Sequence, residues 1–222
     1  MVGAFADADW RVIAQPRRPL ADRWGDRVRE LGLPVSQHEA AAAAAASATV
    51  VVNAMNPLYT RWGTEALPLN DAAVSIARLL RATLMLPGNV YNYGSPLPGV
   101  INESTPQRPT NRKGEIRLQM EAAMRSPGVR SIVIRTGDLF GGPGTGSWMD
   151  LAVIKDLARG RITYPGPRDR PHACAYLPDL ARTFLLLTEA RGRLAAHETF
   201  LFPGYAPRGN DLVSAITAAA AA

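Results

Sequence analysis

Short apolar runs alternate with amphipathic stretches along most of the chain. The apolar runs are rich in β-branched residues, as in VVV at 50–52 and VRSIVIR at 129–135, which is typical of strands. The amphipathic stretches repeat apolar residues at helical spacing, as at Ile76, Leu79 and Leu80. Strands that alternate with helices predict an α/β fold with a largely parallel sheet. Because the strands are apolar throughout, we expect helices on both faces of that sheet.

The expected elements follow one another in a regular order. We expect strands at 10–14, 50–52, 83–86, 129–135 and 199–202. We expect helices at 20–31, 66–81, 113–125, 148–159 and 177–191. The polyalanine run at 40–46 indicates a packed helix that leads into the strand at 50–52, and the alanines at 218–222 indicate a frayed terminus. The proline- and asparagine-rich stretch at 94–112 is expected to be a long loop, and such loops are often functional.

Composition limits the class of protein. A length of 222 residues fits one large domain, and the single cysteine, Cys174, excludes an internal disulfide and a cysteine-rich zinc site. His38, His172 and His197 show no metal-ligand spacing, so we expect no metal. No apolar run reaches the length of a membrane span, and the N-terminal residues do not have the pattern of a secretory signal. We therefore expect a cytoplasmic protein without a membrane partner.

The positive charge does not indicate a nucleic-acid partner. The formal net charge is +6, and all basic residues other than histidine are arginine except Lys113 and Lys155. These arginines are spread along the chain rather than gathered on one element, whereas nucleic-acid-binding faces concentrate their charge. We expect a solvated basic surface and no nucleic-acid partner.

The segment LMLPGNVYNYG at 84–94 carries the strongest chemical signal. A buried strand ends abruptly at Pro87 and Gly88, and polar and aromatic residues follow. In parallel α/β sheets, ligands bind at the carboxyl ends of the strands. This segment is therefore the first candidate for a binding site.

Five segments in order resemble one known family. They are LPGNVYNYG at 86–94, ESTP at 103–106, KGEIRLQME at 113–121, RTGDLFGGP at 135–143 and YLPDLA at 176–181. Their order and spacing resemble the NAD-dependent epimerase/dehydratase family of the extended short-chain dehydrogenase/reductase superfamily, from about Trp10 to about Gly204. The resemblance implies a Rossmann-like, doubly wound α/β fold with a largely parallel sheet and helices on both faces. It implies one NAD(P)-binding domain over 1–222, with the part from about 136 contributing the substrate-binding region.

The start of the chain departs from the family pattern. Members of the family open with a strand and a glycine-rich loop that lets the backbone approach the cofactor pyrophosphate. Here MVGAFADADW resembles the helix after that loop, and Gly3 is the only glycine before Gly25. Loss of a central strand exposes two unpaired inner edges of the sheet. We expect either a truncated or misassigned start, which we favour, or a rearranged sheet.

The catalytic positions also depart from the pattern. The family serine or threonine aligns with Asn89, the tyrosine with Lys113 and the lysine with Arg117. Lysine cannot form the phenolate-like anion of a tyrosine, and it is a base only when neutral, a form that a neighbouring cation favours. The four-residue spacing places Lys113 and Arg117 on one helix face. The alternatives left open are substrate positioning, proton transfer and a solvated helix start, while Asn89 can donate a hydrogen bond to a carbonyl.

The resemblance also implies cofactor contacts. Family members that bind NAD carry an acidic residue after the second strand, whereas an arginine there accommodates the extra phosphate of NADP. Arg17 and Arg18 occupy that place here, so NADP is slightly favoured over NAD, with an ordinary surface arginine pair as the alternative. The candidate cofactor-binding residues are Arg17, Arg18, Asn53, Pro87, Gly88 and Asn89.

The candidate substrate-binding residues lie in three regions of the sequence. Tyr91 and Tyr93 follow the strand at 83–86, with packing at the wall of a cleft as their alternative role. The loop GGPGTGS at 141–147 resembles a substrate loop and contributes Gly141 and Ser147, although a plain flexible connection is the alternative. His172 takes the place of a family arginine that contacts a nucleotide-sugar diphosphate, with a purely structural role as its alternative.

Two functions remain from the sequence. The first is an NAD(P)-dependent epimerase, dehydratase or reductase that acts on a nucleotide sugar or small carbonyl compound by hydride transfer. The second is a catalytically inactive NAD(P)-binding or regulatory module, suggested by the missing tyrosine and lysine. The expected partner is a small-molecule substrate, and a homodimer through the helices at 66–81 and 113–125 is compatible with their apolar positions.

Overall fold

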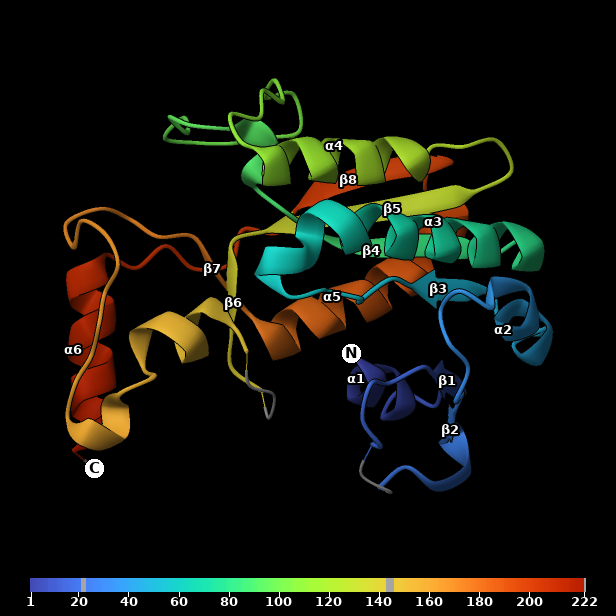
Figure 1. Ribbon diagram of the computed structural model, residues 1–222, viewed down its shortest axis with the longest axis horizontal. Helices are drawn as coiled ribbons and strands as arrows, with labels where there is room; N and C mark the ends of the chain where they lie inside the picture. The colour runs from blue at the N-terminus through green and yellow to red at the C-terminus, as the bar shows by residue number, and fades with distance from the viewer. Residues whose placement is uncertain (21–22, 143–145, 222) are drawn as a thin grey trace. The chain divides into compact units, whose positions relative to one another are not determined.

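The structure is a computed structural model that describes residues 1–20, 23–142 and 146–221 (Figure 1). The chain divides into two compact units. Unit 1 comprises residues 1–135 and 181–201, and unit 2 comprises residues 136–180 and 202–222.

A four-stranded sheet forms the centre of unit 1. Its strands are β3 (Val50–Val52), β4 (Thr83–Asn89), β5 (Arg130–Thr136) and β8 (His197–Leu201), in the order β3-β4-β5-β8. β3 runs parallel to β4, with Val51 opposite Leu84, and β5 runs parallel to β8, with Val133 opposite Thr199. The prediction of a largely parallel α/β sheet is confirmed.

Helices cover both faces of this sheet (Figure 1). Helices α3 (Trp62–Leu80) and α4 (Arg112–Ala123) pack on one face, where Leu84, Leu86 and Val133 enter a common core with them. Helix α5 (Leu177–Ala190) covers the other face, where the Thr188 hydroxyl donates to the Met85 sulfur at 3.1 Å. Successive residues of β4 thus point to opposite layers, as strand geometry requires.

A second, two-stranded parallel sheet lies in the N-terminal part of unit 1. It pairs β1 (Val12–Ala14) with β2 (Val28–Glu30), and helix α1 (Val2–Ala6) precedes it. Helix α2 (His38–Ala44) follows and confirms the polyalanine helix. Among the described residues, no ladder joins β1 to β3, so unit 1 has two separate sheets. This division agrees with the sequence comparison, in which the central first strand of the family pattern has no counterpart.

Two expected helices are wrong. The stretch 20–31 contains a 3-10 turn at Gly25–Arg27 followed by β2, with residues 21–22 outside the described part. Gly25 has φ of 52°, a left-handed conformation that ends any right-handed helix there. The stretch 148–159 is not one α-helix but a π-helical turn at Met149–Val153 and a 3-10 turn at Leu157–Arg159. Both stretches have helix-compatible spacing, which does not by itself determine a continuous helix.

Unit 2 is built on a short parallel ladder and a C-terminal helix. Strands β6 (Asp138–Phe140) and β7 (Cys174–Tyr176), which the sequence did not predict, form the ladder. Helix α6 (Gly209–Ala220), which the sequence did not predict, continues through the first three of the alanines that were expected to fray, with residue 222 outside the described part. At its start the Arg208 backbone N–H donates a hydrogen bond to Asp211 Oδ2 at 3.1 Å, and the negative charge of Asp211 in the first turn favours the helix. In the described part of the chain, no helix is both long and apolar enough to span a membrane.

Candidate functional site

The carboxyl end of β4 has an asparagine side chain, Asn89, of which only the oxygen makes a hydrogen bond among the described residues. Asn89 is the last residue of β4, and its Oδ1 accepts a hydrogen bond from the Tyr91 backbone N–H at 3.1 Å. This bond fixes the turn that leads into the 3-10 helix Tyr91–Tyr93. The Asn89 Nδ2 group donates to no other group among the described residues, so an amide donor is available at the strand end.

Helix α4 places two cations near this strand end. Its N-cap, Asn111, accepts a hydrogen bond from the Gly114 N–H at 3.0 Å. A Cβ on Gly114 would lie 2.4 Å from the Tyr91 carbonyl oxygen, so only glycine allows the first turn of α4 to approach the turn after β4 this closely. The helical spacing then presents Lys113 and Arg117 one turn apart.

Two aromatic rings cover these cations. The Lys113 Nζ lies 4.2 Å from the centre of the Tyr59 ring, and the Arg117 Cζ lies 4.6 Å from the centre of the Trp62 ring. The two rings are stacked on each other, with centroids 5.8 Å apart and planes at 6°. Cation–π contacts of this kind contribute roughly 0.5–2 kcal/mol each. The sequence reasoning missed Tyr59 and Trp62, which are three positions apart where a 3-10 turn at Tyr59–Arg61 leads into α3 at Trp62.

Arg117 is a buried cation without a carboxylate in direct contact. Its side chain is largely buried, its NH1 group lies 3.5 Å from the Pro87 carbonyl oxygen, and its Nε has no hydrogen-bond partner. Burial lowers the pKa of Arg117, while the negative charge of Glu121 acts in the opposite direction. The guanidinium is therefore held at an energetic cost beside the carbonyl end of β4.

Arg135, by contrast, is fully paired. It makes two hydrogen bonds to Glu121, from Nε to Oε1 at 3.2 Å and from NH2 to Oε2 at 2.6 Å, and its NH1 donates to the Tyr93 hydroxyl at 2.7 Å. Burial would lower the pKa of Arg135, but the bonds to Glu121 and Tyr93 outweigh it and raise the pKa. Asn92 adds a donor to Glu121 Oε1 at 3.0 Å. Tyr93, a predicted substrate residue, thus lies in a buried network whose members span α4 and β5.

The predicted cofactor residues lie in contrasting environments. Asn53 is buried, with its Nδ2 donating to Asn70 at 3.2 Å and its Oδ1 accepting from the Met55 N–H at 3.2 Å. The Asn53 amide therefore already holds the loop after β3. Arg17 and Arg18 follow β1 and are exposed.

Pro87 and Gly88 lie within β4 rather than after it. The Pro87 carbonyl accepts from Arg117, as described above. A Cβ on Gly88 would lie 3.0 Å from side-chain atoms of Arg135 and Val133, so this glycine makes room for the buried arginine.

The remaining predicted substrate residues belong to unit 2. Gly141 has φ of 78°, and a Cβ there would lie 2.3 Å from the Tyr176 ring. The Ser147 hydroxyl donates to Asp150 at 2.7 Å, and hydrogen bonds from Ser147 and Gly146 lower the pKa of Asp150. Residues 143–145 of the same predicted loop lie outside the described residues.

His172 is held by two neighbours in unit 2. Its Nε2 lies 2.8 Å from Asp138 Oδ2, and its ring stacks on Trp148 with centroids 4.5 Å apart and planes at 12°. These contacts fix the orientation of the imidazole.

The structure therefore groups the predicted residues by unit. Asn89, Tyr91, Lys113 and Arg117 gather around the end of β4, where the Trp62 ring also lies 6.3 Å from the ring of Tyr91. The groups in unit 2 form a separate set. Among the described residues, no cluster of histidine, cysteine, aspartate or glutamate could hold a metal ion.

Several solved structures have the same fold as this chain. The chain superposes over 100% of its length on 78% of the enzyme WbmH of Bordetella bronchiseptica in complex with NAD⁺, with a TM-score of 0.80 and 14% identity. It matches 70% of the UDP-glucose 4-epimerase of Brucella ovis in complex with NAD over 88% of its own length, with a TM-score of 0.72 and 17% identity. It matches 76% of TunA, an NAD-dependent NDP-hexosamine 5,6-dehydratase, over 99% of its own length, with a TM-score of 0.74 and 15% identity.

The chain shares the Rossmann-like fold of these enzymes. The expectation from the order of sequence motifs is confirmed at this level. No protein-family model matches the sequence, and no curated protein matches it either. With identities below 25%, the likeness establishes the Rossmann-like fold alone, and the chemistry of this chain has to be argued from its own residues at the end of β4.

Proposed function

We propose that the protein is an NAD(P)-dependent relative of the epimerases and dehydratases that reduces or isomerises a nucleotide sugar or a small carbonyl compound by hydride transfer. The observation that carries the proposal is the Asn89 amide donor at the carboxyl end of β4, which no described residue uses, in a fold shared with enzymes bound to NAD. A carbonyl oxygen needs such a donor when negative charge develops on it. Lys113 belongs to the first turn of α4, which lies against the Tyr91 carbonyl just after this strand.

The described residues offer groups for the phosphate and the reacting end of a dinucleotide, but no glycine-rich turn for its pyrophosphate. Arg17 and Arg18 are exposed after β1 and offer cations to a phosphate, and Asn89 offers a donor at the reacting end. The described part of unit 1 has no glycine-rich turn between a strand and a helix, so this chain's own residues hold the cofactor chiefly by charge. We infer a preference for NADP from these two arginines.

Each residue at the end of β4 has a role in this proposal. When bound, NAD(P)H supplies a hydride to the carbonyl carbon of the substrate. Asn89 Nδ2 donates a hydrogen bond to the carbonyl oxygen, and the Lys113 ammonium gives it the proton that completes the hydroxyl. Arg117, which is buried against Trp62 and lies beside the Pro87 carbonyl, holds α4 in position next to β4.

Calorimetric titration with NADPH and NADH tests the cofactor. We expect binding of both, with NADPH the tighter, and we expect the Arg17→Ala/Arg18→Ala double variant to lose the difference between them. Arg11→Ala, which removes another exposed arginine near β1, is the matched control and should leave both affinities unchanged. Absence of binding to either nucleotide would refute the proposal.

A second candidate is a catalytically inactive NAD(P)-binding module. The specific observation in its favour is that the rings of Tyr59 and Trp62 cover Lys113 and Arg117, while neither α4 position carries the tyrosine of the family pattern. Oxidation of NADPH with sugar nucleotides and small aldehydes separates the two candidates. Turnover that Asn89→Ala reduces at least tenfold, while Asn210→Ala on α6 leaves it unchanged, supports the enzyme. Cofactor binding without turnover supports the module.

A further inference from the structure

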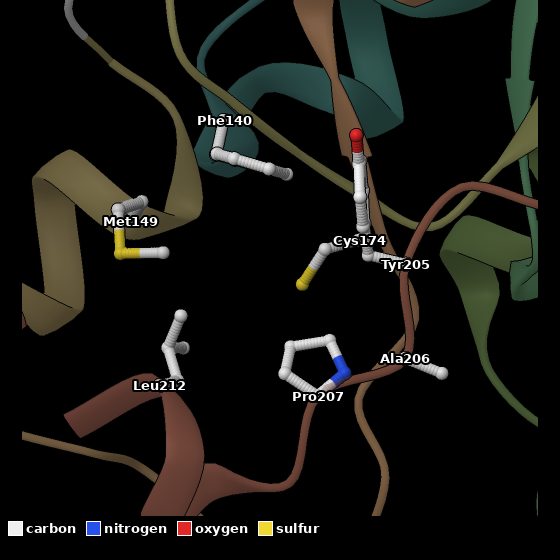
Figure 2. A pocket seen from close by; sticks show the side chains of 7 residues that line it. All are labelled: Phe140, Met149, Cys174, Tyr205, Ala206, Pro207 and Leu212. Carbon is white, nitrogen blue, oxygen red and sulfur yellow. The ribbon is translucent and has the colours of Figure 1, made fainter. Parts of the chain in front are cut away.

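Unit 2 contains a cavity lined by residues to which the proposed function gives no role. Its volume is about 360 Å³, and all of its lining residues belong to unit 2. They are Phe140, Met149, Cys174, Tyr205, Ala206, Pro207 and Leu212. Figure 2 shows the side chains of Phe140, Met149 and Cys174 directed toward the central space, with Pro207 and Leu212 closing it from below.

The lining offers hydrocarbon and sulfur atoms and no charged side chain. Burial, together with the charge of Asp138, raises the pKa of the Cys174 thiol to about 11, so the thiol is neutral at physiological pH. The Tyr205 hydroxyl lies 3.5 Å from Asp179 Oδ2 and points away from the central space (Figure 2). A charged ligand group would lose its hydration here without gaining a partner.

The backbone around the cavity is held by hydrogen bonds. β7 pairs with the segment at 205–207 through reciprocal bonds between Cys174 and Tyr205, with N···O distances of 2.8 and 2.7 Å. The His172 N–H donates to the Pro207 carbonyl at 2.9 Å. Gly204 has φ of 52°, and a Cβ there would lie 2.2 Å from the Cys174 carbonyl, so glycine permits this close pairing. The cavity is therefore a preformed hollow.

We propose that this cavity binds an uncharged aliphatic or aromatic group larger than a single benzene ring. A dry engineered cavity of roughly 150 Å³ in another protein already accepts benzene, and ligand pockets begin at roughly 300 Å³. The proposed function gives no role to any lining residue, and the residues it assigns to the cofactor and to the carbonyl group lie in unit 1, so the two sites are tested separately.

A series of straight-chain primary alcohols tests the site by titration calorimetry. Each methylene that leaves water for the cavity should tighten binding about fourfold. We expect this gain from butanol upward, followed by a plateau once the chain fills the cavity. No heat of binding for octanol up to its solubility limit, or an affinity that does not depend on chain length, would overturn the proposal.

Variants at Leu212 locate the binding. Leu212→Trp should fill the cavity and weaken octanol binding at least tenfold, while Leu212→Ala should move the plateau to longer alcohols. Val213→Trp, on the same helix but outside the lining, is the matched control and should bind octanol normally. If Leu212→Trp fails to fold, the shift of the plateau in Leu212→Ala decides. Unchanged chain-length dependence in Leu212→Ala would refute the site.

Binding of alcohol is measured without nucleotide, so its outcome is separate from that of the cofactor titration. Loss of NADPH binding with retained alcohol binding would leave this inference intact and refute only the proposed function. Alcohol binding that persists unchanged in Leu212→Trp would refute this inference alone.

Discussion

Two buried arginines near the same strand end show how one residue type serves two purposes. Arg135 has a carboxylate in bidentate contact and a tyrosine hydroxyl as its third partner. Arg117 has only a carbonyl at 3.5 Å and the face of Trp62. The first arrangement satisfies the buried charge, whereas the second leaves part of it unsatisfied. An unsatisfied buried cation is more typical of a functional position than of a structural one.

The pair of Arg135 and Glu121 should be critical to stability. Glu121→Gln removes the negative charge while keeping the shape, which leaves the Arg135 guanidinium buried and unpaired. We expect the free energy of unfolding to fall by about 3–5 kcal/mol, measured by urea denaturation. The exposed pair of Arg61 and Glu65, 3.2 Å apart, provides the control. Glu65→Gln should cost less than about 1 kcal/mol, and equal losses in the two variants would contradict the prediction.

Cys174 should make stability depend on alkaline pH. The folded state raises the pKa of its thiol from 9.0 to about 11. Below pH 9 the thiol is protonated in both states, so its contribution is fully present. Between pH 9 and 11 only the unfolded state loses the proton, and stability falls as pH rises, by at most about 1.4 kcal/mol per unit.

Comparison with Cys174→Ala measures this slope. The variant lowers stability at every pH by removing buried volume, but it should lose less additional stability than the natural chain between pH 8 and 10.5. The two slopes are compared from urea midpoints at fixed temperature. Parallel slopes would show that the buried thiol does not titrate as expected.

At the scale of elements, α3 carries a proline within its helical run. Pro68 is exposed and lies inside Trp62–Leu80, where it cannot donate the hydrogen bond that the Thr64 carbonyl would accept. Pro68→Ala should raise the free energy of unfolding by about 1–2 kcal/mol, because the helix gain exceeds the lost rigidity of the unfolded chain. Asp71→Ala, at an exposed position one turn later, should change it by less than about 0.5 kcal/mol. No gain from Pro68→Ala would mean that the helix already accommodates the proline without strain.

The same scale shows what the sequence could predict. The long helices α3, α4 and α5 and the buried strands β4 and β5 follow from periodicity, because each buries a continuous apolar face. β2, β6 and β7 were not predicted, because these three-residue strands have no run of β-branched residues such as the three valines that mark the equally short β3.

The contacts of Lys113 and Arg117 with the rings of Tyr59 and Trp62 could not be predicted from the sequence either. Lys113 and Tyr59 are 54 positions apart, and only the packing of α3 against α4 brings them together. Asn89, Lys113 and Arg117 could be located by the order of motifs, but their contacts could not. Long-range contacts of this kind depend on topology rather than on local pattern.

At the scale of the whole molecule, the two units have cores of different size. The common core of unit 1 joins α3, α4, β4 and β5. Among the described residues, unit 2 has few buried apolar side chains, namely Val153, Cys174, Ala175 and Leu180. Stability is not uniform across a structure, and regions with few buried apolar contacts open first. Unit 2 should therefore open at lower denaturant than unit 1.

The single cysteine makes this order measurable. Cys174 is buried in unit 2, so it reacts with a thiol reagent only when that unit opens, whereas Trp10, Trp24 and Trp62 report mainly on unit 1. We expect the urea midpoint for Cys174 labelling to lie below the midpoint for tryptophan fluorescence in the variant Trp148→Phe, which removes the one tryptophan of unit 2. Coincident midpoints would mean that the two units unfold as one cooperative body. Octanol, which binds the proposed cavity, should raise the labelling midpoint and leave the fluorescence midpoint in place, because a ligand stabilises only the folded part that holds it.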